Sequence, residues 1–292
     1  MVALVREEKA RYSKKLLDVR NDLVFKIIFG EERNQDLLLM LLNAILTEEV
    51  VEITFLDTHI GAEFVDEKYS VMDIRVRTKD QMEINIEMQI ENHDGFEQRM
   101  LLYWAKLYTK QLKGGAPYTQ LKKAVQISIV DFNFLKNDHF HSMFHLLEKE
   151  KQFSFTDHCE IHVLELPKVG LIEDRDRQEI LTKWMLFLVG DDKTKEALAM
   201  TDMGIEKAYD ELQRVSEDEV MRERAIARDK FLSDQATRKE LAELKGRNEG
   251  REEGRSEAIL AMYSKGGLSV EQIASILELA VDEVNVVINQ VQ

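Results

Sequence analysis

The sequence has little cysteine, no long apolar run and a shortage of basic charge. A single cysteine, Cys159, among 292 residues excludes an intramolecular disulfide and a thiolate zinc cluster, and it fits a reducing compartment. No apolar run approaches the roughly 20 residues that cross a bilayer, and the opening MVALVREEKARYSKK contains no apolar export segment. We therefore expect a soluble, cytoplasmic protein with no membrane partner.

The balance of charge and the missing motifs exclude further classes. With 40 basic and 55 acidic residues the net charge is −15, so any attraction for nucleic acid must come from a local basic surface. The chain has no glycine-rich phosphate loop, no nucleophile elbow and no reactive-cysteine motif. Its length allows one large domain or two ordinary ones.

Helix caps and apolar periodicity predict an α/β fold for the first half of the chain. The expected elements are a helix from Asn21 or Asp22 to Phe29, a helix from Asn34 to Leu46, a strand over Val50–Ile60, a hairpin within Tyr69–Ile90, a helix from Asp94 to about Leu112 and a strand over Lys123–Phe132. Asp94 and Glu97 have the spacing of a capping box. The order helix, three strands, helix, strand indicates an α/β core.

The hairpin is the most informative stretch. If its turn centres on Asp80, facing residues have numbers that sum to 160 and point to the same side of the sheet. One side is then apolar, with the pairs Ile74–Ile86 and Val76–Ile84. The other side pairs Arg77 with Glu83, Arg75 with Asn85 and Asp73 with Glu87, and Gln89 shares it.

The expected Asp73–Glu87 pair breaks a rule of sheet pairing. Like charges that face each other are destabilising, and local rules tend to fail at functional sites. A divalent cation held by both carboxylates would remove the conflict, and Gln89 could orient a water beside it. The alternative is a solvated polar face on which Arg75 and Lys68 neutralise the acids.

A basic stripe follows the helix expected from Asp94. Its members lie within an arc of about 80°, opposite a more apolar side. The stripe contains Arg99, Tyr103, Lys106, Lys110 and Lys113, and the far side contains Leu101, Trp104, Ala105, Tyr108 and Leu112. Residues 97–130 carry six basic and one acidic residue, so this surface could follow a phosphate backbone. The alternative is an ordinary solvated helix face.

The second half of the chain is expected to be largely helical. Residues 133–158 look like an insertion, Glu160–Pro167 reads as a strand, and helix is expected from about Ile180. We expect an α/β domain over residues 1–200, a charged helical arm over 201–265 and a helix-turn-helix-like tail over 266–292. The 3–4–3 spacing of Ile205, Ala208, Leu212 and Val215 starts a heptad seam, which predicts a homodimer through the arm.

Two other features of the sequence are weaker candidates for function. The tail has no Lys or Arg from Gly266 onward, so we expect it to pack or to bind a partner rather than to read DNA. His139, His141 and His145 have a ligand-like spacing, but a surface cluster is the simpler interpretation. Asp22 and Lys26 lie one helical turn apart and could form a simple i,i+4 pair, or an auxiliary acid and base near the Asp73 site.

Several segments together carry a family resemblance. They are NDLVFKIIFG, LLNAIL, the Asp73 strand, the IEMQ strand, RMLLYWAKLYTKQLKGG and YTQLKKAVQISIVDF. Over roughly residues 16–170 they resemble the recombination-promoting nuclease (Rpn) family, transposase-like proteins with a PD-(D/E)XK nuclease domain. The resemblance implies a restriction-endonuclease-like αβββαβ core with a long helical C-terminal extension, a bacterial source and Mg²⁺-dependent DNA cleavage, with Mn²⁺ or Ca²⁺ as alternative ions.

The resemblance also assigns roles to residues. It makes Asp73 the core aspartate and Glu87 the second acid, both as metal ligands, and it puts Gln89 where the superfamily more often has a lysine. Lys26 or Lys106 could then replace that lysine. The hypothesis is a metal-dependent endodeoxyribonuclease linked to recombination or mobile elements, in which DNA is contacted by Arg99, Tyr103, Lys106 and Lys110. The alternatives are a catalytically silent nuclease fold that binds DNA or a protein partner, and an RNA-directed nuclease.

Overall fold

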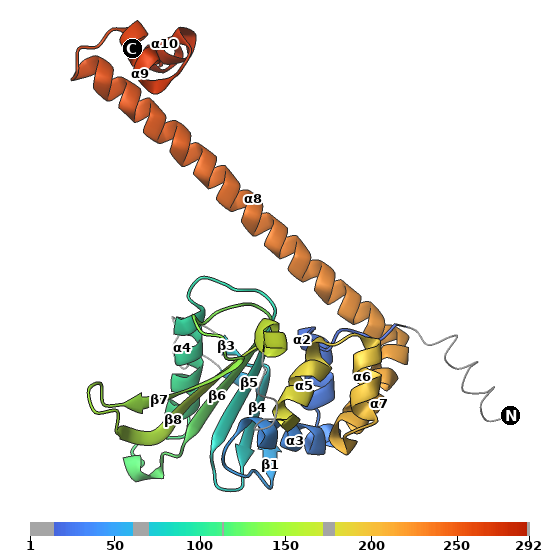
Figure 1. Ribbon diagram of the computed structural model, residues 1–292. Coiled ribbons are helices and arrows are strands. Elements are labelled where there is room, and N and C mark those ends of the chain that lie inside the picture. The colour runs from blue at the N-terminus through green and yellow to red at the C-terminus, as the bar shows by residue number, and fades with distance from the viewer. Residues whose placement is uncertain (1–14, 61–69, 113, 172–178, 291–292) are drawn as a thin grey trace, which may run out of the picture. The chain divides into compact units, whose positions relative to one another are not determined.

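The computed structural model describes residues 15–60, 70–112, 114–171 and 179–290. The chain forms two compact units, residues 1–228 and residues 229–292. The first unit is a mixed α/β structure in which a sheet lies between a single helix on one face and a group of helices on the other (Figure 1). The fold is that of the restriction-endonuclease-like α/β class, with a long helical extension at the C-terminal end.

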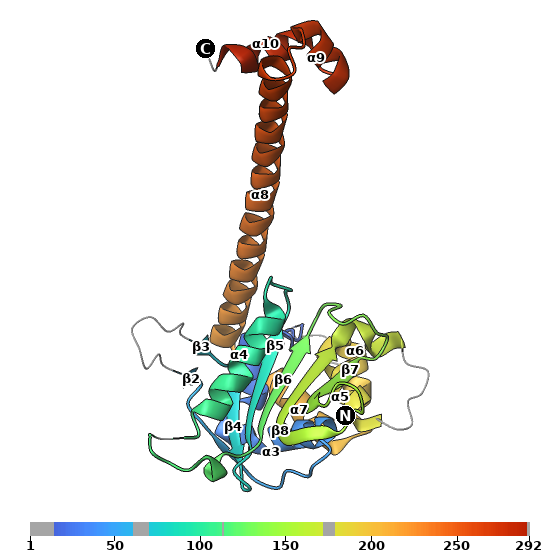
Figure 2. The ribbon, with the colours of Figure 1, turned by 90° about the vertical axis from the view of Figure 1, so that its left-hand side faces the viewer.

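The sheet of the first unit has six strands in the order β1-β4-β5-β6-β8-β7. Their bounds are β1 Ile53–Phe55, β4 Ile74–Thr78, β5 Glu83–Gln89, β6 Ala124–Val130, β7 His141–Leu147 and β8 Ser154–Glu165. β5, β6 and β8 are parallel to one another, and β1, β4 and β7 are antiparallel to their neighbours. In Figure 2 the strands lie side by side, with β4 towards one end and β7 towards the other. A separate two-stranded sheet joins β2 (His59–Ile60) and β3 (Ser70–Val71).

The hairpin of β4 and β5 has the register that the sequence predicts. Ile74 faces Ile86, Val76 faces Ile84 and Arg77 faces Glu83. The apolar side is fully buried, as period-two alternation requires. On the polar side Glu83 and Asn85 have no exposed surface, whereas the Arg77 side chain stays 38% exposed. The alternative of a fully solvated polar face is therefore wrong, because α4 covers the β5 part of this side.

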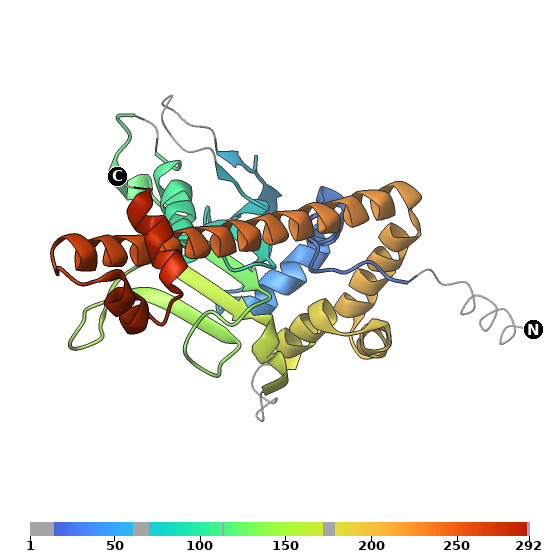
Figure 3. The same ribbon diagram turned by 90° about the horizontal axis from the view of Figure 1, so that it is seen from above.

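Helices pack on both faces of the sheet. The strands share one large apolar core with four helices: α2 (Asp22–Phe29), α3 (Gln35–Ile45), α5 (Glu179–Val189) and α7 (Met203–Glu217). A fifth helix, α6 (Asp192–Ala199), packs between α5 and α7. Seen from above, the blue α2 and α3 lie alongside the yellow α5–α7 (Figure 3). α4 (Phe96–Thr109) covers the other face, against β5 and β6. Short 3-10 turns occur at Glu32–Asn34, Tyr118–Gln120 and Leu166–Leu171.

The first helix forms for the reasons visible in its sequence. The Asn21 side chain accepts hydrogen bonds from the backbone N–H groups of Leu23 and Val24, which would otherwise lack partners at the helix start. Five apolar side chains in the eight-residue α2 are buried, and the helix ends at Gly30. This confirms the predicted bounds.

Other predicted bounds are wrong in detail. α4 begins after Gly95, which adopts φ 79° and supplies the cap in place of the predicted Asp94–Glu97 capping box, and it ends at Thr109 rather than near Leu112. The long strand predicted over Val50–Ile60 is two short strands, β1 and β2. The predicted insertion over 133–158 contains β7, and the start of β8 precedes the predicted strand at Glu160.

The heptad-like segment of α7 packs inside the first unit. Ile205, Ala208, Leu212 and Val215 have no exposed surface and belong to the large core. Their 3–4–3 spacing is explained by this packing, because one helix stripe facing a core has the same period as a coiled-coil seam. A homodimer through the helical arm stays a prediction, but this segment of α7 cannot supply the dimer contact because it is buried in the core.

The second unit is built from helices. α8 (Glu219–Ser264) begins in the first unit and continues into the second, followed by α9 (Val270–Leu277) and α10 (Val281–Asn289). Ser269 and Gln272 form the predicted capping box at the start of α9. A small core gathers Ile259, Ile273, Ala274, Val284 and Ile288. In the described part of the chain, no helix is long and apolar enough to cross a membrane.

Candidate active site

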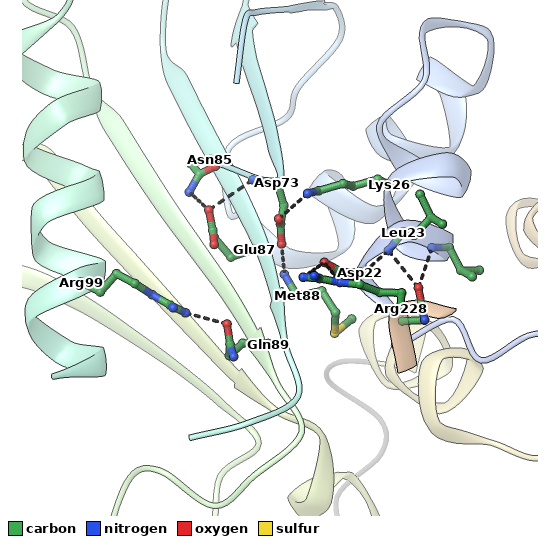
Figure 4. Close-up of polar contacts among 12 residues, drawn as sticks. Asp22, Leu23, Lys26, Asp73, Asn85, Glu87, Met88, Gln89, Arg99 and Arg228 are labelled. Atoms are coloured by element: carbon green, nitrogen blue, oxygen red, sulfur yellow. Dashed lines mark hydrogen bonds and ion pairs between the residues drawn. The ribbon is translucent and has the colours of Figure 1, made fainter. Parts of the chain in front are cut away.

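Two carboxyl groups meet where β4 and β5 begin to separate. The β4–β5 ladder ends at the pair Ile74–Ile86, and Asp73 and Glu87 lie just beyond it. The Asp73 N–H donates to Glu87 Oε1 at 3.3 Å, and the Met88 N–H donates to Asp73 Oδ2 at 3.0 Å (Figure 4). Each carboxylate is thus held by the backbone of the other strand, which fixes the two side by side.

The surroundings of this pair disfavour a negative charge on Glu87. Glu87 is 7% exposed, and burial, together with the negative charge of Asp73, raises the pKa of Glu87 to about 8. The Asn85 side chain opposes this effect by donating to Glu87 Oε1 at 3.0 Å. Near neutral pH the site therefore favours one proton on Glu87 unless another positive charge approaches.

Lys26 brings a positive charge to the site from α2. Its Nζ lies 2.8 Å from Asp73 Oδ1, in an ion pair that leaves Asp73 mostly buried and Lys26 one-third exposed. Lys26 lies one turn after Asp22 on α2, yet the two residues do not form the simple i,i+4 pair considered from the sequence. Lys26 binds the site carboxylate instead.

Asp22 pairs with an arginine from the far end of the first unit. Arg228, in the first part of α8, donates from Nη2 to Asp22 Oδ2 at 2.7 Å and from Nε to Asp22 Oδ1 at 3.0 Å (Figure 4). The hydrogen bond to Asp22 raises the pKa of Arg228, and the charges of Asp22 and Asp73 raise it further, so the guanidinium lies within electrostatic reach of the site. No local pattern in the sequence could have found this contact across 206 positions.

Gln89 and Arg99 bind each other on the α4 side of the hairpin. Arg99 Nη2 donates to Gln89 Oε1 at 2.6 Å, and Gln89 Nε2 donates to the Glu91 carbonyl at 2.9 Å. The Arg99 guanidinium also lies over the rings of Phe96 and Tyr103, at 5.1 and 6.0 Å from their centres. In this structure both ends of the Gln89 amide are bound to protein.

Tyr103 lies near the carboxyl pair, whereas the remaining residues of the basic stripe lie further along α4. Burial raises the pKa of Tyr103, and the charges of Glu87 and Asp73 raise it further. Lys106 on α4 and Lys110, the residue that follows its end at Thr109, are half-buried, and Lys113 lies outside the described residues. The apolar side predicted for α4 is partly wrong. Leu101 is 54% exposed, and the sheet is instead contacted by Phe96, Met100 and Leu107.

A layer of buried polar side chains on β5 and β6 contacts Glu87. Besides Glu87, the Asn85 side-chain amide donates to Gln126 Oε1 at 2.9 Å, and Gln126 Nε2 donates to Ser128 Oγ at 3.2 Å. These residues alternate along β5 and β6 on the side that α4 covers. The sequence does contain a signal for this layer. In both strands, polar residues alternate with apolar ones, although the strands are otherwise apolar enough to predict burial.

The arginines of β4 do not neutralise the site carboxylates. Arg75 Nη2 and Arg77 Nη2 each lie 2.7 Å from the buried carboxylate of Glu83. The suggestion that Arg75 neutralises Asp73 and Glu87 is therefore wrong, and Lys68 lies outside the described residues. Lys26 forms the ion pair with Asp73, and the charge of Arg99 lowers the pKa of Glu87 from a greater distance.

The histidine cluster belongs to the opposite part of the sheet. His141 Nε2 lies 2.8 Å from His162 Nδ1, and His162 Nε2 lies 2.8 Å from Glu160 Oε1. Lys123 completes this network with an ion pair to Glu160 at 2.8 Å. Within the described ranges, no group of three or more His, Cys, Asp or Glu side chains is arranged to hold a metal ion.

The strand pair with its two acids, flanked by helices on both faces, defines a nuclease-like fold of the PD-(D/E)XK class. The family described as PD-(D/E)XK nuclease family transposase matches residues 19–242, and the chain belongs to this family. Searches of curated proteins and of solved structures found no match. The family supports a nuclease or transposase-related function.

Proposed function

We propose that this protein is a metal-dependent endonuclease that hydrolyses DNA phosphodiester bonds, in the context of recombination or mobile elements. The observation that carries the proposal is the arrangement of Asp73 and Glu87, held side by side by each other's strands with Lys26 Nζ 2.8 Å from Asp73. Membership of the nuclease family supports the same reaction class.

The chemistry of Asp73 and Glu87 fits a hard divalent cation. Mg²⁺ is usually held by one or two carboxylates, with waters and substrate phosphates completing its shell, so a third protein carboxylate is not required. The raised pKa of Glu87 supports this, because a cation between the two groups would offset the repulsion from Asp73. A bound Mg²⁺ would supply transition-state charge stabilisation and would make water a stronger nucleophile. Mn²⁺ and Ca²⁺ share the same oxygen preference.

The other side chains have complementary roles in the proposed reaction. Lys26 would take the place of the lysine that Gln89 replaces, because its ammonium group reaches the carboxylate pair from α2 and can donate to the attacking water or to the phosphate. Arg99 and Tyr103 would contact the scissile or neighbouring phosphate, and Gln89 would orient water after releasing Arg99 or Glu91. Lys106 and Lys110 would contact the phosphate backbone further along α4.

A second candidate is a silent nuclease fold that binds DNA or a protein partner. The engaged amide of Gln89 favours it, because a residue that positions water must first give up one of two hydrogen bonds. In that case the protein would cleave nothing with either Mg²⁺ or Mn²⁺, and Mg²⁺ would leave its melting temperature unchanged.

A plasmid-nicking assay with matched variants separates these alternatives. Asp73→Asn should lower Mg²⁺-dependent cleavage by at least ~10²-fold, since it removes a ligand of a metal that acts on both water and phosphate. Asp80→Asn is the control, because it removes the same charge from the exposed turn of the same hairpin. Equal cleavage by wild type and Asp73→Asn would exclude this site. An RNA of matching sequence, tested in parallel, would reveal an RNA-directed nuclease.

A further inference from the structure

The two edge strands of the six-stranded sheet, β1 and β7, differ in length. Edge strands expose unpaired backbone groups, and proteins usually blunt them with short strands, lysine or proline. β1, at one edge, has only three residues. β7, at the other edge, has seven residues, HSMFHLL, with no lysine, proline or acid. Over residues 141–145, before its register shifts, the β7 edge therefore lacks those protections.

The hairpin of β7 and β8 also exposes large apolar side chains. Six of them are each at least 45% exposed: Met143, Phe144, Leu146, Leu147, Phe153 and Phe155. Among the described strands, β7 pairs with β8 alone. Apolar side chains that gather beside an open strand edge are typical of a surface that another chain covers.

The charge of this hairpin favours a second copy of the same chain as that partner. Residues 141–155 carry two lysines and two glutamates, so the segment is neutral within a chain of net charge −15. Two highly acidic molecules repel each other over most of their surfaces, and a neutral patch is where that repulsion is least. Both copies can therefore approach through this hairpin at a lower electrostatic cost.

The backbone fixes which residues of β7 can pair outward. The Glu165 N–H donates to the Phe140 carbonyl at 2.7 Å. Because hydrogen-bonding direction alternates along an antiparallel strand, the odd residues His141, Met143 and His145 turn their N–H and C=O groups away from β8. A register shift after His145 ends the regular segment, so outward pairing is limited to residues 141–145.

We propose that two copies of this chain pair edge to edge through β7, antiparallel about a two-fold axis at Met143. Met143 of one copy then faces Met143 of the other, and His141 of each copy faces His145 of the other. The interface is isologous, since the same five residues serve on both sides. The two six-stranded sheets become one continuous sheet, and both exposed edges are removed together.

The pairing leaves each carboxyl site within its own chain. β5 is separated from β7 by β6 and β8, so the two sites are seven strand spacings apart, or about 34 Å at about 4.8 Å per spacing. Asp73, Glu87 and Lys26 of each site all come from one chain. The proposal therefore does not depend on nuclease activity, and each can fail without the other.

Engineered cysteines test the register directly. In a Cys159→Ala background, Met143→Cys should form a disulfide-linked dimer on mild oxidation, because facing hydrogen-bonded residues have Cα atoms about 5.5 Å apart, within disulfide range. Ser142→Cys is the matched control. In this register Ser142 faces Phe144, so two Ser142 positions lie about 8 Å apart, beyond that range. Equal cross-linking of the two variants, or none with Met143→Cys, would overturn the proposed register.

Light scattering on the full chain tests the surface without cross-linking. Wild type should be dimeric at micromolar concentration, and Met143→Lys should shift it to monomer, because a charged lysine on an edge strand opposes pairing. Met200→Lys, which places the same charge on an exposed methionine of another surface, should remain dimeric. Circular dichroism would check that both variants are folded. A monomeric wild type would overturn the proposal. A dimer that survives Met143→Lys would also overturn it and would point to the helical arm as the dimer contact.

Discussion

Replacing Glu87 with Gln should remove a pH-dependent loss of stability from the metal-free protein. Burial, assisted by the Asp73 charge, raises the pKa of Glu87 from 4.5 to about 8. Between these values the folded state keeps a proton that the unfolded chain has released, so the stabilisation is present at low pH and is lost as the pH rises through 8. Wild type should lose about 2–3 kcal/mol of unfolding free energy from this group between pH 6 and pH 9.

Urea denaturation at pH 6, 7, 8 and 9 in the presence of EDTA would measure this loss. Both tryptophans, Trp104 and Trp184, lie in the unit that contains the site, so their fluorescence reports on that unit. Subtracting the Glu87→Gln profile from the wild-type profile removes the contribution of every other titrating group. Parallel profiles for the two proteins over pH 6–9 would refute the reasoning.

Three further changes test neighbouring parts of the site. Asn85→Leu should raise the pKa of Glu87 further, since the Asn85 hydrogen bond lowers it, and the pH profile of cleavage should move to higher pH. Lys26→Met should reduce cleavage by ~10²-fold, the typical effect of losing one stabilising donor, with partial recovery in Lys26→Arg. Changing Lys106 and Lys110 together to Glu should weaken DNA binding in filter or anisotropy assays and flatten its salt dependence, because fewer counterions are released. An unchanged profile, rate or salt slope would remove the corresponding residue from the proposed site.

The register of the β4–β5 hairpin could be predicted because strand periodicity leaves little freedom. A slip of one residue would move Ile74 and Val76 to the polar side, so the alternation and the turn near Asp80 together select one pairing. The proximity of Asp73 and Glu87 follows from that register alone. The capped α2 was predictable for a similar reason, because Asn21 and Gly30 mark its ends by local chemistry.

Other features depend on packing between distant segments, which periodicity does not encode. The 3–4–3 stripe of α7 has the same spacing whether it faces a core or another chain, so the sequence could not distinguish burial from a dimer seam. The predicted apolar side of α4 is partly wrong for the same reason, because Arg99 binds Gln89 of the hairpin and Tyr103 lies near the carboxyl pair. A basic residue has the same angular position around the helix whether it binds a buried acceptor or faces water, so the spacing in the sequence does not distinguish the two.

The polar face of α2 shows why the site needed the tertiary structure. Asp22 and Lys26 are spaced for a local i,i+4 pair, which is worth only about 0.2–0.5 kcal/mol on a solvated helix. In the fold, Lys26 turns to Asp73 and Asp22 turns to Arg228. Asp73 is mostly buried, and charges interact more strongly where water is partly excluded. The local pair is thus given up for two long-range contacts that bring cations to an acidic site. Such a conflict between local pairing and tertiary arrangement is expected at a functional site.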